Sequence, residues 1–69
     1  MQPHQERVVA EKAELDSKIE KLHNFIHGLN TPFQSVDAWE QARLQEQLRI
    51  MNSYSDVLDR RIKAFKEAA

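Results

Sequence analysis

The second half of the chain carries an apolar pattern that leaves little choice of fold. From Ala38 to about Glu67 no residue breaks a helix, and one line of positions steps by four and three residues without a slip. This spacing keeps one side of a helix apolar, whereas a strand would need every second position. The pattern predicts one long amphipathic helix over about residues 38–67. The line consists of Leu44, Leu48, Met51, Ser55, Leu58, Ile62 and Phe65.

The first half carries a similar line, which begins after Pro3 and ends before Gly28. Proline suits a helix start, because its missing N–H has no partner in the first turn anyway. Glycine favours a helix end, because it adopts the left-handed conformation at low cost. These signals predict an amphipathic helix over about residues 4–28. Its line consists of Val8, Lys12, Leu15, Ile19, Leu22 and Ile26.

The connection between the helices, residues 29–37, contains two possible helix starts. Thr31 and Gln34 have the spacing of a capping box, in which two side chains satisfy each other's backbone N–H groups. Asp37 and Glu40 have the same spacing. We expect a short helical turn over the five residues that follow Thr31. The apolar residues expected to cover the open end of the hairpin are Phe33, Val36 and Trp39.

These two helices predict an all-α fold, an antiparallel helical hairpin that forms one domain over residues 1–69. A second apolar line runs beside the main line of the long helix, and two lines make a face wider than one partner helix covers. We therefore expect a homo-oligomer, either a dimeric four-helix bundle or a larger cyclic or dihedral assembly. The second line consists of Ile50, Tyr54, Val57 and Ala64.

Composition narrows the possible stabilising devices and partners. A chain of 69 residues builds a small core, and the absence of cysteine excludes disulfides. A net charge of −1 provides no overall basic field, so bulk nucleic-acid binding is not expected. No apolar run is long enough for a membrane span, and the first residues, MQPHQERVV, lack the build of a secretory signal. We expect a cytoplasmic protein.

A polar stretch, Asn52-Ser53-Tyr54-Ser55-Asp56, interrupts the long helix where apolar residues are expected. In the first interpretation the small residues let a partner helix approach, and the Ser55 hydroxyl bonds a carbonyl of its own helix. In the second interpretation the gap left by Ser53 and Ser55 lines a pocket beside the Tyr54 ring. The sequence leaves both open.

Lys12 interrupts the first line as Ser55 interrupts the second. An antiparallel hairpin with its turn near residues 29–36 places Lys12 level with the segment from Leu48 to Ser55. A buried lysine needs a partner, which Asp56 or an incoming phosphate would supply. The alternative is that the aliphatic part of the Lys12 side chain lies along the apolar line while its ammonium group reaches water.

Basic residues gather in the last turns of the long helix, where cations complement the helix dipole. Arg60 and Arg61 also offer forked donors that suit phosphate oxygens. Arg61 follows Tyr54 by seven residues, two helical turns and about 10 Å, on the same face. This separation suits a nucleotide whose base stacks on the tyrosine ring and whose phosphate meets the guanidinium.

Metal binding and catalysis have little support. His23 and His27 are four residues apart, a spacing that can hold a transition metal, but His4 would supply a third ligand only from another chain. There is no HExxH motif and no serine in a glycine elbow. We expect no metal, no cofactor and no enzymatic activity.

One residue pattern runs through the chain: ERVVAEKAELDSKIEKLHNFI, then a phenylalanine in a short loop, then EQARLQEQLRIMNSYSDVLDRRIKAF. This pattern resembles a family of small phage and prophage proteins related to one from crAss-like phages. The resemblance spans most of the chain, and it implies a helical protein of phage origin. The architecture is also similar to that of the anti-CBASS and anti-Thoeris sponges of phages, which bind nucleotide immune signals. The residues that carry the family resemblance are Arg7, Val8, Val9, Glu14, Leu15, Ile19, Leu22, Phe25, Phe33, Leu44, Gln47, Met51, Tyr54, Leu58, Arg61, Ile62 and Phe65.

Two hypotheses of function follow from the sequence and its resemblance. In the first, the protein is a nucleotide sponge that holds a cyclic oligonucleotide or an ADP-ribose derivative. In the second, it is a helical bundle that binds or inhibits a host protein and has no small-molecule ligand. The residues predicted to contact a nucleotide are Tyr54, Arg61, Arg60, Lys12 and Ser55.

Overall fold

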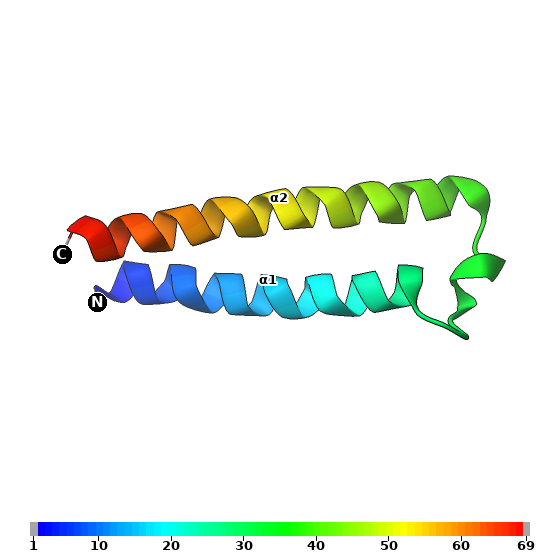
Figure 1. Cartoon of the computed structure of the whole chain (residues 1–69), viewed down its shortest axis with the longest axis horizontal. Helices are drawn as coiled ribbons and strands as arrows, with labels where there is room; N and C mark the ends of the chain where they lie inside the picture. The colour runs from blue at the N-terminus through cyan, green and yellow to red at the C-terminus, as the bar shows by residue number, and fades with distance from the viewer. Residues whose placement is uncertain (1, 69) are drawn as a thin grey trace.

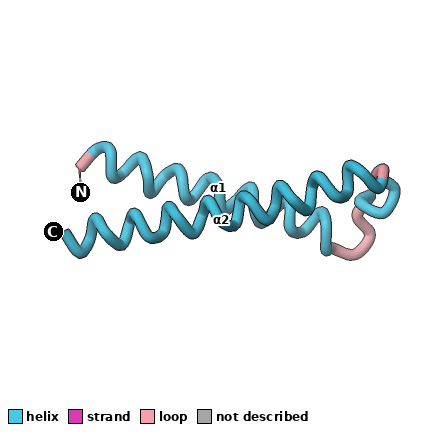
Figure 2. Tube along the Cα trace, turned by 90° about the horizontal axis from the view of Figure 1, so that it is seen from above, coloured by secondary structure: helices cyan, strands magenta, loops and turns pink. Residues whose placement is uncertain are grey.

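The computed structural model describes residues 2–68, which form two long α-helices joined by a short 3-10 helix (Figure 1). Helix α1 spans Pro3–His27, η1 spans Pro32–Ser35 and α2 spans Ala38–Ala68. The all-α antiparallel hairpin predicted from the sequence is confirmed. The molecule is long and thin, 49 × 18 × 15 Å, and its helices cross near their midpoints (Figure 2).

The two ends of α1 are held in different ways. At the start, the backbone N–H of Gln2 donates to the Gln5 side-chain oxygen at 2.9 Å. At the end, the predicted left-handed glycine is wrong: Gly28 has φ −73° and ψ 157°, and the left-handed residue is Asn30, with φ 62°. Gly28 is needed for a different reason, because a Cβ there would overlap the carbonyl oxygen of Asn24. The chain therefore reverses two residues later than the sequence suggested.

The connection confirms the Asp37 half of one predicted capping box, while Glu40 pairs with Arg43 instead, and it corrects the other box. The Asp37 carboxylate accepts hydrogen bonds from the backbone N–H groups of Trp39 and Glu40, at 3.0 and 3.4 Å, and so caps the start of α2. Thr31 makes no such cap for η1. Its hydroxyl instead donates to the carbonyl oxygen of Phe25 at 2.7 Å, because η1 folds back against the end of α1.

A glutamine and an aromatic pair tie this connection to the helices. The Gln41 side-chain amide donates to the carbonyl oxygens of Phe33 and Val36, at 3.0 and 2.9 Å. The ring of Phe33 is buried and forms a T-shaped pair with the ring of Phe25, with 5.8 Å between ring centroids. Trp39, which we expected to help cover this end, is 76% exposed. Phe33 closes the hairpin without it.

Two small apolar clusters form the core along the contact between α1 and α2. The terminal cluster lies toward the free ends of the helices and contains Val8, Leu15 and Leu58. The connection cluster lies toward η1 and contains Ile26, Phe33 and Leu48. All of these except Phe33 belong to the two lines predicted from the sequence. Along residues 2–68 neither long helix has enough continuous apolar sequence to cross a membrane.

Candidate functional site

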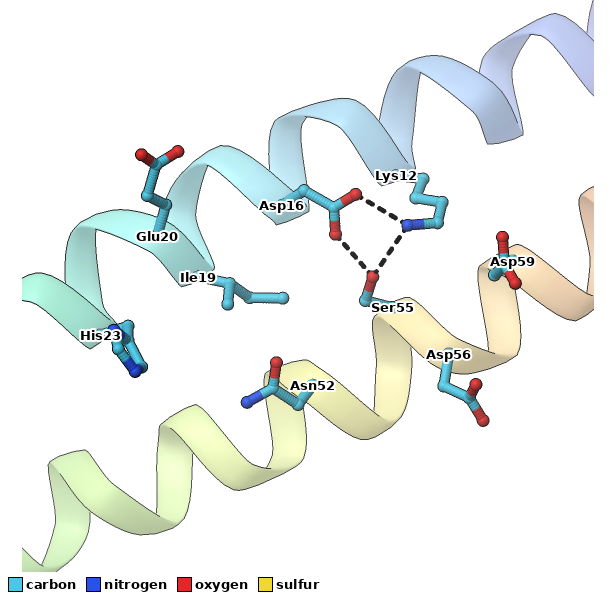
Figure 3. Close-up of a pocket in the computed structure, with 9 residues that line it drawn as sticks. All are labelled: Lys12, Asp16, Ile19, Glu20, His23, Asn52, Ser55, Asp56 and Asp59. Atoms are coloured by element: carbon cyan, nitrogen blue, oxygen red, sulfur yellow. Dashed lines mark hydrogen bonds and ion pairs between the residues drawn. The ribbon is translucent and has the colours of Figure 1, made fainter.

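A polar layer joins the two helices near the middle of the hairpin. The Lys12 ammonium group lies 2.7 Å from the Asp16 carboxylate, one turn along α1, and 3.2 Å from the Ser55 hydroxyl on α2. The Ser55 hydroxyl in turn donates to the other Asp16 oxygen at 2.5 Å. Figure 3 shows the three groups as a closed triangle of contacts. The antiparallel register brings Lys12 to Ser55, at one end of the segment with which the sequence placed it level.

This layer forms one wall of an open groove between the helices, with a volume of about 460 Å³. The groove runs along one flank of the hairpin, with side chains of both helices around it (Figure 3). Ile19 supplies its one apolar side chain. The residues that line it are Lys12, Asp16, Ile19, Glu20, His23, Asn52, Ser55, Asp56 and Asp59.

Carboxylates dominate the charge of this groove. Asp16 accepts hydrogen bonds from Lys12 and Ser55, and both lower its pKa, the bond from Lys12 more strongly. The hydrogen bond to Asp16 likewise raises the pKa of Lys12. Hydrogen bonding from Lys63 lowers the pKa of Asp59. All three groups therefore carry their charge at neutral pH.

The groove is chemically unsuited to a phosphate. It contains four carboxylates, and its one ammonium group is already bound to Asp16. A phosphate entering here would meet like charges at short range, which is unfavourable wherever water is partly excluded. The hydroxyl, amide and imidazole groups of Ser55, Asn52 and His23 offer neutral hydrogen bonds instead.

Tyr54 and Arg61 lie on the opposite flank of α2, away from the groove. Successive helical residues are turned by about 100°, so Tyr54 points to one side of the seam and Asn52 to the other. The Tyr54 ring is 43% exposed and lies between Ile50 and Val57, which are also exposed. Arg61 is exposed and forms no ion pair within the described part of the chain. The five predicted ligand residues thus do not converge on one place in a single hairpin.

Arg60 and Arg61 also lie on different sides of α2, because they are successive residues of the helix. The guanidinium group of Arg60 lies 3.2 Å from the Asp56 carboxylate, one turn earlier on α2. Asp56 was the protein partner expected for Lys12, and this expectation is wrong. Asp56 lies too far round α2 from the seam, so it pairs along its own helix, and Asp16 takes its place.

The histidine pair is a local contact. The rings of His23 and His27 stack at an angle, with 4.7 Å between their centroids. Across residues 2–68, no group of three or more histidine, cysteine, aspartate or glutamate side chains is placed to hold a metal ion.

Sequence reasoning missed Asp16, although a signal for it was present. Asp16 follows Lys12 by four residues, the spacing at which opposite charges meet along a helix. Since Lys12 was placed level with the segment from Leu48 to Ser55, its neighbour one turn away was expected to face the same segment. The ion pair therefore followed from the spacing and needed no partner from α2.

Comparison with known protein families identifies the family of this chain. A family model described as Sequestin matches residues 2–64, which is nearly the whole chain. The same comparisons found no matching curated protein and no matching solved structure.

Proposed function

The chain belongs to the Sequestin family, and from this premise we propose that it sequesters a host nucleotide signal of antiphage defence. The family's name implies binding rather than catalysis. We propose a cyclic oligonucleotide or an ADP-ribose derivative as the ligand, and a phage genome as the source of the chain. The sequence resemblance to phage proteins supports both choices.

The observation that carries this proposal is the exposed pair formed by Tyr54 and Arg61 on one flank of α2. A nucleotide needs an aromatic surface for its base and cationic donors for its phosphate. Two helical turns, about 10 Å, separate these two residues, which matches the distance from a base to its phosphate. Arg61 makes no ion pair within residues 2–68, so a phosphate does not have to displace a carboxylate from it.

The other predicted residues contribute less directly. The Arg60–Asp56 pair is exposed, with both side chains 67% accessible, so exchanging Asp56 for a phosphate costs little. Lys12 and Ser55 bind each other across the helices and hold α2 in register. In this proposal they position Tyr54 and contact a ligand only through its neutral groups, because the groove around them is acidic.

Calorimetric titration with cyclic dinucleotides, cyclic trinucleotides and ADP-ribose cyclisation products tests this function. We expect one class of ligand to bind the native chain. Tyr54→Ala should weaken binding by about 1–3 kcal/mol per stacked base, whereas Tyr54→Phe keeps the ring and should retain most of it. Arg61→Ala should weaken binding and flatten its salt dependence.

Arg43→Ala is the matched control for Arg61. Arg43 lies on the same flank of α2, three turns before Tyr54, and is paired with Glu40 at 2.7 Å. Its loss should leave binding unchanged. If the native chain gives neither heat nor a thermal shift with any ligand of the panel, the nucleotide proposal fails, and a protein-binding bundle becomes the function to pursue.

A further inference from the structure

The hairpin exposes more surface than a compact protein of its mass. A folded monomer of 8.1 kDa exposes roughly 4,500 Å², whereas this chain exposes 5331 Å². The excess, roughly 800 Å², equals the area that one partner buries in a standard protein interface. Two helices in one layer cannot cover both sides of their apolar residues, so a second layer is the natural way to bury this area.

Exposed large apolar side chains in the described part of the chain include Val9, Leu29 and Trp39, and three more gather along one flank of α2. Ile50 is 53% exposed, and Tyr54 and Val57 are each 43% exposed. Ser53, a small exposed residue, lies between Ile50 and Val57 on the same side of the helix. The steps from Ile50 to Ser53 and from Ser53 to Val57 are three and four residues, the spacing of a helix-packing seam. A small residue at the centre of a seam lets a second helix approach closely.

The charges along this seam identify the second helix. Glu46 precedes Ser53 by seven residues and Arg60 follows it by seven. Ile50 and Val57 also lie on either side of Ser53. Two copies of this face that run in opposite directions therefore place apolar residues opposite apolar residues and unlike charges opposite each other. An antiparallel copy places glutamate opposite arginine at both ends, whereas a parallel copy places each charge opposite its like. The existing partners, Arg49 for Glu46 and Asp56 for Arg60, are held in exposed pairs that exchange at little cost.

We propose that a second copy of this chain docks antiparallel on α2, about a two-fold axis near Ser53. Ile50 packs against the partner's Val57, and Glu46 lies level with the partner's Arg60. The interface is isologous, so each contact occurs twice. This proposal does not rest on the nucleotide ligand, because every observation behind it concerns surface area, seam spacing and charge order. In the dimer Arg60 meets the partner's Glu46 in place of a phosphate, and Arg61 remains as the phosphate donor.

Disulfide trapping tests the orientation, because the native chain has no cysteine. Ile50→Cys and Val57→Cys variants are mixed in denaturant with reductant, refolded together and mildly oxidised. A disulfide needs Cα atoms within about 7 Å of each other. An antiparallel dimer therefore gives mainly the mixed 50–57 disulfide, several-fold above either symmetric product, when the masses are measured without reduction.

Ala10→Cys, on an exposed position of α1, is the control for random oxidation. Predominance of the symmetric 50–50 and 57–57 products would show a parallel pair and overturn the proposal. Trapping no greater than that of Ala10→Cys would also overturn it, and the exposed seam would then belong to a different protein.

Sedimentation equilibrium tests the charge pairing without any cysteine. Glu46→Arg should raise the dimer dissociation constant at least tenfold, and adding Arg60→Glu should restore most of the loss. Such a recovery would show that Glu46→Arg does not weaken the dimer through misfolding, because the double variant still carries this substitution. A native chain that remains monomeric at high micromolar concentration, or a double variant weaker than Glu46→Arg alone, contradicts the proposal.

Discussion

Leu58 and Ser55 are neighbours on the same line of α2, yet they belong to differently built regions. Leu58 is fully buried in the terminal cluster, together with Val8 and Leu15. Ser55 is half-buried in the polar layer, where its hydroxyl bonds both Lys12 and Asp16. Burial of apolar surface supplies most of the stability of a small fold, whereas satisfied polar contacts restrict which pairing of helices is acceptable.

The difference teaches how a two-helix protein sets its register. A seam of leucines and isoleucines would tolerate sliding by one heptad, because every layer would remain apolar. Sliding α2 past α1 would separate Ser55 from Asp16 and leave Lys12 against an apolar neighbour. We infer that the clusters stabilise the hairpin and that the polar layer selects its alignment.

The largest effect is expected in the terminal cluster. Leu58→Ala should lower the free energy of unfolding by about 2–5 kcal/mol, because it removes a fully buried side chain and leaves a cavity. Urea unfolding at one fixed protein concentration measures this loss, since association also contributes to stability. A loss under about 1 kcal/mol would mean that the terminal cluster is not where the stability lies.

A smaller loss is expected when an apolar side chain enters the polar layer. Ser55→Leu should cost about 1–3 kcal/mol, because the leucine crowds the helix contact and removes the hydroxyl that bonds Lys12 and Asp16. The same urea titration applies. A gain in stability would show that this position is an ordinary core position, and the distinction between the two regions would fail.

Removing only the hydroxyl sharpens the comparison further. Ser55→Ala should cost about 0.5–1.5 kcal/mol, the net value of the hydrogen bonds that it deletes. Ser53→Ala is the matched control, because the Ser53 hydroxyl bonds only the Arg49 carbonyl of its own helix, at 3.2 Å in an exposed position. It should be neutral or slightly stabilising, since alanine is the better helix former. Equal effects at both serines would remove the special role assigned to Ser55.

The smallest effect is a pH dependence of the polar layer. The pKa of Asp16 is lowered in the folded chain, so its contribution is complete above the ordinary value of 3.8 and is lost as the pH falls through the lowered value. The pKa of Lys12 is raised, so its contribution is complete below 10.5 and is lost at higher pH. Thermal unfolding of native and Asp16→Asn protein should therefore differ most near neutral pH and converge in acid. A constant difference down to low pH would contradict this assignment.

The sequence predicted the helices and their contact well, for a clear physical reason. An uninterrupted rhythm of fours and threes reports which side of a helix is buried, and it placed Leu15 and Leu58 in the core. The antiparallel register then followed from the position of the turn, and it placed Lys12 level with a segment that ends at Ser55, which is its partner in the structure. Both inferences used only spacing along the chain.

Features that depend on local geometry were predicted less well. Gly28 was expected to be left-handed, but the left-handed residue is Asn30. Position 28 requires a glycine for a different reason, because a Cβ there would overlap the carbonyl oxygen of Asn24. Trp39 was expected to cover the open end, but it is exposed, and the smaller ring of Phe33 is buried there beside Phe25. The sequence pattern shows that an aromatic residue is present, but not which of two will reach the core.

The candidate ligand residues divide between these two kinds of inference. Spacing placed Tyr54 and Arg61 on one flank of α2, and both are exposed there. It did not reveal that Lys12 and Ser55 lie in an acidic groove, because that groove takes its carboxylates from both helices. Their roles in ligand binding, like the homo-oligomer itself, remain predictions.

The connection between α1 and α2 also affects the order in which the hairpin folds. Closing a short loop costs less entropy than closing a long one, and the bonds from Gln41 to Phe33 and Val36 close loops of only eight and five residues. We expect the chain to zip from the connection, with the contact between His4 and Phe65 at the free ends forming last. Amide hydrogen exchange should then grow faster toward those free ends, so the region around Tyr54 lies midway between the most persistent turns of the hairpin and the first to fray.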